Sequence, residues 1–456
     1  MTGGWKALAA LLMLMACAAP APVARVAQLP RGLPPVLLFG AAPAPVTRRD
    51  NVSIARDFLR LVFQLESGRR IDALSRFERP VTVRLAGRPG PATVSHDLDI
   101  LLARLRDEAG IDISRAGADR PAGINVELID KRALQQAVPK AACFVVPNVA
   151  SWQEFRQRRN RPELNWSALR ERTVMSVFIP ADVSAQEIRD CLHEEIAQAL
   201  GPVNDIYDLP DSVFNDDNFH TVLTGFDMVI LRTIYDGGLQ SGMTREAVVA
   251  RLPAILSRLN PAGEGRAPRP LPGVTPAAWV DAVETALGAS ARNQGRVGAA
   301  ERAVLIARNE GWRDNRLGFS LYAYGRLVVP IDTREGLRAL NEAKAVLSRR
   351  VETAIHTAHV DVQLAAHAMA AGRARRALDL ADGAESTVRV AQNAGLLFSL
   401  QMVRSVALAS LGETEASELA RREALGWARY AYAEPSEIRV QVAEIELLGH
   451  RTGEGG

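Results

Sequence analysis

The sequence of 456 residues predicts an α+β domain followed by an all-α domain. At residues 48–258, the predicted order is a helix, a strand, a helix, further strands and another helix, which is an α+β arrangement. A segment rich in Pro, Gly and Arg then reads as an interdomain linker, at residues 259–276. Beyond it the strand signals nearly vanish, and Ala-rich helical patterns predict an all-α domain at residues 277–450.

The composition is that of a folded globular protein. Hydrophobic residues make up 48% of the chain and charged residues 23%. The net charge is only +3, so there is no electrostatic reason to expect nucleic acid as a partner.

The N-terminus carries an export signal. Lys6 precedes an apolar run that ends at Cys17 and is too short to span a membrane. Residues 14–17, Leu-Met-Ala-Cys, resemble the bacterial lipoprotein processing site. We therefore expect residues 1–17 to be a lipoprotein signal peptide with lipidation at Cys17. A plain signal peptide that is cut nearby is the alternative.

The Pro/Ala-rich residues 18–47 are then expected to form a flexible tether. Ala18 is not an acidic retention signal for the inner membrane, which favours the outer membrane. The expected location is the periplasmic side of the cell envelope, with the lipid anchor as the contact with the membrane.

With Cys17 assigned to lipid, only Cys143 and Cys191 remain. In an oxidising periplasm they form a plausible disulfide. It would close a loop of about 49 residues and contribute roughly 4 kcal/mol in the chain-entropy model. Two buried free thiols are the alternative.

Hydrophobic periodicity places the elements of the first domain. The predicted elements are a helix from Asp50 to just before Gly68, a strand at 81–85, a helix from Ser95 to Gly110, and strands at 124–128, 143–146 and 174–179. The next helix begins with a capping box, Ser184 to Glu187, and runs to Gly201, which is expected to adopt the left-handed conformation.

This helix places polar residues beside an apolar stripe. Glu194 and Gln198 are four residues apart and therefore lie side by side on one flank. Glu195 falls within the edge of the stripe, where a charge is costly unless it is paired or coordinated.

The second domain shows weak self-similarity. Segments beginning near Gly372 and Gly412 resemble each other, and the 40-residue spacing is close to the tetratricopeptide period. Glycine at these turns supplies the backbone freedom that a helical hairpin needs. We expect an irregular helical-repeat domain of three or four helix pairs whose concave surface binds a protein partner. A non-repetitive helical bundle is the alternative.

The segment from Glu194 to Asn204 has the spacing of the metzincin zinc motif, H-E-x-x-H-x-x-G-x-x-H. Glu194, Gln198 and Asn204 stand at the three histidine positions, and Glu195 at the position of the catalytic glutamate. Downstream, Phe214 occupies the place of the Met-turn methionine.

Thr224 and Asp227 begin a helix that is similar to the last helix of matrixins. Residues 80–237 thus resemble a matrixin-type catalytic domain whose ligands were replaced. The resemblance implies a zincin-like (metzincin-type) fold before the tetratricopeptide-like helical domain.

The chain also resembles a family of uncharacterised proteobacterial lipoproteins. These share an E-E-x-x-Q-x-L-G-x-x-N-D core, present at residues 194–205, and an earlier D-F-x-x-x-x-F-x-x-E-S-G element, present at residues 57–68. This family has no known function, so the resemblance constrains architecture more than activity.

The missing histidines favour a non-catalytic protein, because zinc prefers nitrogen and sulfur ligands. We therefore expect a pseudo-metalloprotease domain with no cofactor and with unoccupied positions at Glu194, Gln198 and Asn204. The alternative is a metal-dependent hydrolase of peptide or cell-envelope substrates, in which Glu195 is the general base and zinc or another divalent cation is held by Glu194 and Gln198. A purely structural lipoprotein is the third possibility.

Overall fold

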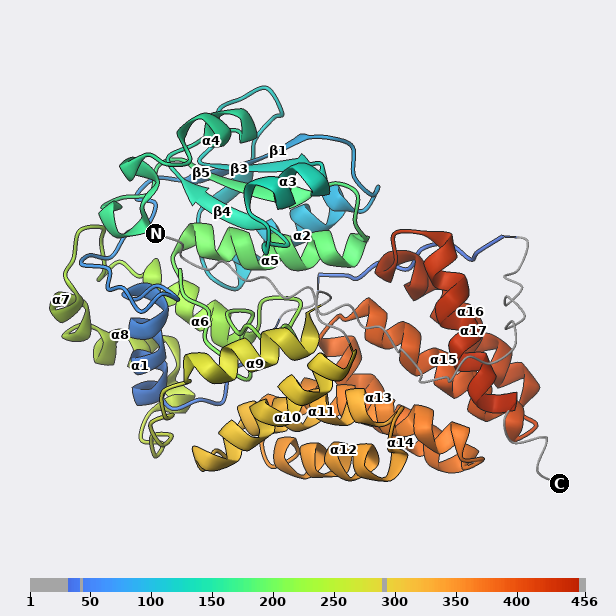
Figure 1. The fold of residues 1–456 in the computed structure, drawn as a ribbon. Coiled ribbons are helices and arrows are strands. Elements are labelled where there is room, and N and C mark those ends of the chain that lie inside the picture. The colour runs from blue at the N-terminus through green and yellow to red at the C-terminus, as the bar shows by residue number, and fades with distance from the viewer. Residues whose placement is uncertain (1–31, 42–43, 289–292, 451–456) are drawn as a thin grey trace. The chain divides into compact units, whose positions relative to one another are not determined.

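The computed structural model describes residues 32–41, 44–288 and 293–450. These residues form two compact units (Figure 1). Unit 1 contains the described residues between Gly40 and Leu271, and unit 2 contains residues 32–39 together with those from Pro272 onward. The division at 271/272 falls within the segment where the sequence predicts a linker. Cys17 lies outside the described residues.

Unit 1 is a mixed α/β domain built on a five-stranded sheet. Its strands are β1 (Val81–Gly87), β2 (Ile113–Arg115), β3 (Ile124–Ile129), β4 (Phe144–Pro147) and β5 (Met175–Pro180). Its helices are α1 (Asn51–Val62), α2 (Val94–Asp107), α3 (Lys131–Ala137), α4 (Trp152–Arg158), α5 (Ala185–Leu200), α6 (Gly225–Ile234), α7 (Arg245–Val249) and α8 (Leu252–Leu259).

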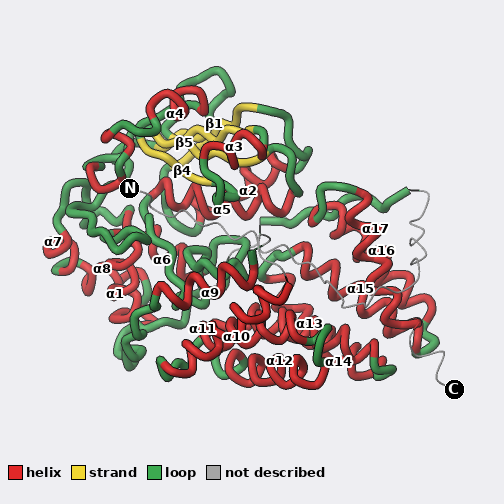
Figure 2. The backbone as a smooth tube through the Cα atoms, viewed as in Figure 1, coloured by secondary structure: helices red, strands yellow, loops and turns green. Residues whose placement is uncertain are grey.

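The strand order is β2-β1-β3-β5-β4. All neighbours are parallel except β4, which pairs antiparallel with β5 and forms one edge of the sheet. Figure 2 shows the strands between two layers of helices. One face packs on α2 and α5, and the other carries an aromatic cluster with α3 and α4 that includes Phe144, Phe155 and Phe178.

The four strands predicted from alternation are present as β1, β3, β4 and β5. The sequence missed β2 because it has only three residues, and it missed the short helices α3, α4, α7 and α8 for the same reason. The capping box at Ser184 and Glu187 is confirmed, with Oγ of Ser184 accepting a hydrogen bond from the backbone N–H of Glu187 at 3.1 Å.

The prediction for Gly201 was wrong in its reason. Its φ is −178°, which is extended rather than left-handed backbone. The residue is glycine because a Cβ atom would lie 2.2 Å from Cδ1 of Ile234. The helix therefore ends where α5 and α6 come close together.

The segment predicted to be a flexible tether is ordered in two of its parts. Phe39 is buried against α16 of unit 2. In unit 1, the N–H of Ala44 donates to Glu108 at 2.9 Å, and Gly225 leaves room for the carbonyl of Pro45. The tether prediction therefore does not hold for residues 34–39 and 44–47.

Unit 2 is all-helical in its described residues. Its helices are α9 (Ala277–Leu287), α10 (Asn293–Asn309), α11 (Asn315–Val328), α12 (Thr333–Leu347), α13 (Ala354–Ala370), α14 (Ala374–Val390), α15 (Ala394–Ser410), α16 (Thr414–Ala431) and α17 (Pro435–His450). None of the described helices of the chain meets the length and hydropathy needed to span a bilayer.

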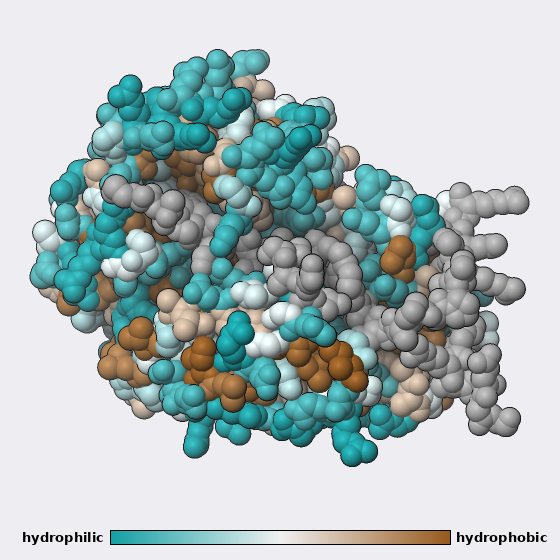
Figure 3. Space-filling model, in the orientation of Figure 1, coloured by the Kyte–Doolittle hydropathy of each residue, from teal (hydrophilic) through white to brown (hydrophobic). Residues whose placement is uncertain are grey.

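The helices of unit 2 are stacked in sequence order. Each packs on the next, and the odd-numbered helices from α9 to α17 also contact one another in a row. Gly372 and Gly412 have φ values of 71° and 82°, which confirms the predicted need for backbone freedom at these turns. Figure 3 shows that apolar side chains reach the visible surface of unit 2 in separate patches.

Candidate functional site

Two sets of contacts hold helix α5 in place, one near its middle and one at its C-terminal end. A disulfide joins Cys191 in the helix to Cys143, which immediately precedes β4, with a Cα–Cα distance of 6.0 Å. This confirms the predicted pair. At the C-terminal end of α5, the buried guanidinium of Arg172 donates to the carbonyl oxygens of Gln198 and Gly201, the latter at 2.6 Å. Burial lowers the pKa of Arg172 to about 10.

The residues at the second and third histidine positions are used in structural hydrogen bonds. Nε2 of Gln198 donates to Oδ2 of Asp205 at 2.9 Å. Nδ2 of Asn204 donates to the backbone carbonyl of Arg60 in α1, also at 2.9 Å. Both side chains are buried. Their amide groups therefore attach the loop after α5 to its surroundings.

Glu195 is buried, as its place on the apolar stripe predicts, with 4% of its surface exposed. One carboxylate oxygen, Oε2, has no hydrogen-bond partner among the described residues. The carboxyl group of Glu195 also forms a hydrogen bond with the backbone of Val145 on the edge strand β4. Burial, and then repulsion from Asp205, raise the pKa of Glu195 well above its ordinary value.

A hairpin from α1 brings a further carboxyl group to this place. Gln64 and Arg70 pair in antiparallel fashion, and Gly68 provides the left-handed turn residue with φ 77°. Glu66 near the tip is exposed as a residue, but its carboxyl group hydrogen-bonds to Asp205. Loss of water around this group and repulsion from Asp205 raise the pKa of Glu66.

Five carboxyl groups thus influence one another electrostatically, and we call them the carboxyl cluster. They are Glu66, Glu194, Glu195, Asp205 and Asp216. Burial raises the pKa of Asp205 to about 6, although hydrogen bonds from Glu66 and Gln198 oppose the rise. Burial, followed by repulsion from Asp205, raises the pKa of Glu194 well above its usual range. Such groups favour the neutral, protonated form.

The arrangement does not fit a zinc ion. In the part of the chain that the structure describes, no three His, Cys, Asp or Glu side chains are grouped so that they could hold a metal. Nδ1 of buried His193 accepts a hydrogen bond from the N–H of Leu223 at 3.2 Å, and Nε2 of His220 lies 3.0 Å from the carbonyl oxygen of Pro210. Both histidines therefore form hydrogen bonds with backbone groups.

Sequence reasoning missed Glu66, Asp205 and Asp216 as members of this site. A signal was present, because Glu66 and Asp205 belong to the two sequence motifs at residues 57–68 and 194–205. The structure brings these motifs together across 139 positions of the sequence (205 minus 66). A contact of that separation has no local signature in the chain.

The loop beyond the site is held by ion pairs rather than by turn chemistry alone. Fully buried Arg49 contacts Asp57 at 2.8 Å and Asp211, and stacks over the ring of Phe226 at 3.7 Å. Nearby, Arg60 binds Asp208 at 2.7 Å. Asp208 and Asp211 therefore anchor the loop to α1 and to the segment before it.

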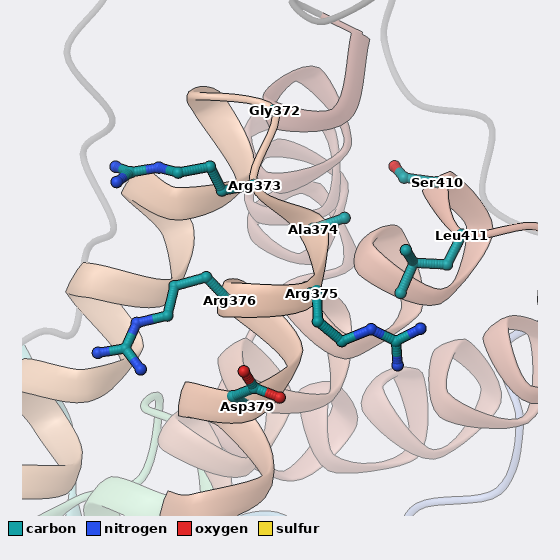
Figure 4. A pocket seen from close by; sticks show the side chains of 8 residues that line it. All are labelled: Gly372, Arg373, Ala374, Arg375, Arg376, Asp379, Ser410 and Leu411. Atoms are coloured by element: carbon teal, nitrogen blue, oxygen red, sulfur yellow. The ribbon is translucent and has the colours of Figure 1, made fainter.

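A separate open pocket of about 650 Å³ lies in unit 2 at the start of α14. Figure 4 shows that its arginines do not converge, because Arg373 and Arg376 point away from Ser410 and Leu411 whereas Arg375 lies on their side. These side chains are exposed. The pocket therefore lacks the converging donors of an anion site.

Residues 51–254 match the family described as "Protein of unknown function (DUF2927)". This match covers most of unit 1 and includes all five residues of the carboxyl cluster. No curated protein matches the chain, and no solved structure matches it.

Proposed function

We propose that the protein is a lipid-anchored periplasmic factor in which unit 1 is a non-catalytic, zincin-like scaffold and unit 2 binds a protein partner. The observation that carries this proposal is the use of Gln198 and Asn204. At the positions of two zinc ligands, these side chains instead form buried hydrogen bonds of 2.9 Å within the protein. Side chains at the positions of two metal ligands therefore hold the domain together instead of binding a metal.

The zincin-like assignment is supported by the order of the elements around α5. The helix follows β5, packs on β4 and β5, and is followed by a loop that contains the fully buried Phe214. Thr224 and Asp227 then form a capping box at the start of α6. These are the features on which the resemblance to matrixins rests.

The periplasmic location is supported by the Cys143–Cys191 disulfide, since such bonds persist in oxidising compartments. The partner-binding role of unit 2 is supported by its stacked helices and by the row of odd-numbered helices. In a tetratricopeptide-like array, this row forms a continuous surface on which a partner can lie.

The test is to restore the histidines. We expect the purified protein to bind no stoichiometric zinc, and the triple variant Glu194→His, Gln198→His, Asn204→His to gain zinc, because its motif then reads H-E-x-x-H-x-x-G-x-x-H. Metal content after dialysis is measured by atomic emission. Tightly bound zinc in the unaltered protein contradicts the proposal, and a folded triple variant that binds none contradicts the zincin-like geometry.

One observation favours the alternative, a hydrolase of peptide or cell-envelope substrates with Glu195 as general base. Its Oε2 is buried without a partner, and such groups are frequent at catalytic sites. Hydrolysis of peptide or cell-envelope substrates by the purified protein, in the presence of divalent cations and abolished by Glu195→Gln, would establish this function. Activity that is unchanged in the variant excludes Glu195 as the base.

A further inference from the structure

Residues 34–39 lie in an extended conformation on the helix α16. The N–H of Leu37 donates to the carbonyl of Gly426 at 3.2 Å. One guanidinium nitrogen of Arg429 donates to the carbonyl of Pro34 at 2.8 Å. The segment is therefore held through main-chain atoms at its first residue and near its middle.

Phe39 is the apolar anchor of the segment, with 7% of its surface exposed. Its ring stacks on Trp427 at a centroid distance of 4.5 Å and meets the edge of Tyr430 at 5.6 Å. Aromatic pairs with these arrangements stabilise a contact beyond the area that they bury.

Gly426 makes room for the side chain of Leu37. A Cβ atom at this position would lie 2.8 Å from Cγ of Leu37. A glycine in the interior of a helix lowers helix stability relative to alanine. Its presence in α16 is explained by the space that the extended segment requires.

These contacts have the form of a bound peptide. Extended peptides are commonly held by main-chain hydrogen bonds together with a pocket for one side chain, and proline favours their extended conformation. Pro35 and Leu38, between the contacts, are exposed. The buried ring of Phe39, the side chain of Leu37 at Gly426 and the two hydrogen bonds are thus among the contacts that hold residues 34–39 to α16.

We propose that helix α16 carries a recognition groove, formed by Gly426, Trp427, Arg429 and Tyr430. The groove binds an extended apolar peptide that begins with proline and ends in an aromatic residue. Residues 34–39 occupy this groove in cis. The inference rests on the partner-binding role proposed for unit 2 and specifies the partner's chemistry. The partner presents a segment of this kind and displaces residues 34–39.

Occupation in cis sets the affinity that a partner must overcome. A covalently attached segment competes at an effective concentration of about a millimolar when its linker is short. Loosening the segment therefore strengthens the binding of a free peptide, whereas filling the space above Gly426 abolishes it.

The experiment is a titration of a fluorescent peptide covering residues 33–40 into the purified full-length protein, followed by fluorescence polarisation. We expect saturable binding to the Phe39→Ala variant and at least about tenfold weaker binding to the unaltered protein. The double variant Phe39→Ala, Gly426→Ala should not bind. Phe39→Ala, Gly383→Ala is the matched control, because Gly383 lies in α14 with nothing within 4 Å of a Cβ atom.

No binding to Phe39→Ala, equal binding to the unaltered protein, or binding that survives Gly426→Ala would overturn the inference. Amide exchange provides a second measurement if Phe39→Ala does not fold. Exchange at Leu37 should accelerate in Gly426→Ala but not in Gly383→Ala, and equal protection in all three proteins contradicts cis occupation. These outcomes do not depend on zinc binding in unit 1, so they are separable from the test of the proposed function.

Discussion

Gly201 has no room for a side chain, because a Cβ atom built on it lies 2.2 Å from Cδ1 of Ile234. We expect Gly201→Ala to lower the free energy of unfolding of unit 1 by about 1–3 kcal/mol, as overpacked cores do. Urea denaturation monitored by circular dichroism measures the change. Gly117→Ala is the control, since a Cβ atom at Gly117 meets nothing within 4 Å.

The clash can be separated from a backbone effect by removing its partner atom. Ile234→Val lacks Cδ1, so the cost of Gly201→Ala should shrink in that background. An unchanged cost would show that Ile234 is not the reason for the glycine.

The raised pKa of Asp227 predicts how the stability of unit 1 depends on pH. Asp227 is fully buried, and burial raises its pKa to about 6 despite hydrogen bonds from Ser212, Val213 and Thr224. Between its ordinary pKa of 3.8 and about 6, the folded state binds more protons than the unfolded state. The free energy of unfolding must therefore fall as pH rises through this window.

The difference between 3.8 and about 6 corresponds to roughly 3 kcal/mol at most. We expect urea midpoints for unit 1 to be higher at pH 5 than at pH 8, with a smaller change in Asp227→Asn. The raised pKa values of Glu194, Glu195 and Asp205 act in the same direction. A stability that rises from pH 5 to pH 8 contradicts this assignment.

Single residues of the candidate site were predictable only in part. The burial of Glu195 followed from its angular position among apolar residues on one helix, which is local information. The carboxyl group of Glu66 was not predictable in this way, because its partner Asp205 lies on another element. Likewise, no local pattern predicted that the amide of Asn204 donates to the carbonyl of Arg60, which lies in the helix α1.

At the scale of elements, the disulfide couples α5 to the start of β4. Removing it in the double variant Cys143→Ala, Cys191→Ala should lower the free energy of unfolding by about 2–4 kcal/mol, because the unfolded chain gains freedom. Urea denaturation with and without dithiothreitol checks this. The reductant should destabilise the unaltered protein by a similar amount and leave the double variant unchanged.

Long elements with a clear period were predicted well, and short ones were not. The capping boxes of α5 and α6 mark their first turns in the sequence itself, because the capping side chains bind the backbone of their own helix. By contrast, β2 has three residues and is defined by its pairing with β1. A pairing partner more than twenty residues away leaves no periodic pattern in so short a strand.

At the scale of the whole molecule, the proposed anchor makes a prediction about location. If Cys17 carries the lipid, Cys17→Ser should leave the fold intact but release the protein from the membrane fraction into the soluble periplasmic fraction. Cell fractionation with immunoblotting measures the distribution, and incorporation of labelled fatty acid tests the modification directly. Membrane association that persists in the variant without label would contradict lipidation at this residue.

The division into two units was readable from the chain, because a change in composition near residues 259–276 separates two patterns of hydrophobic periodicity. The course of residues 34–41 and 44–47 was not readable from the chain. Their Pro/Ala-rich composition is typical of a tether, yet Phe39 packs on Trp427 in unit 2 and Ala44 binds Glu108 in unit 1. A glycine in each receiving helix, Gly426 and Gly225, makes the space for this segment.

The sequence by itself determined the helices and strands of useful length and their caps, because each depends on residue type and on spacing within one element, and it indicated the cysteine pair. Only the tertiary structure decided that Gln198 and Asn204 serve as structural hydrogen-bond donors, that the five carboxyl groups of the carboxyl cluster influence one another, and that residues 34–39 lie on α16. Those contacts join elements far apart in the chain, and burial and proximity in space, rather than order in sequence, set their energies.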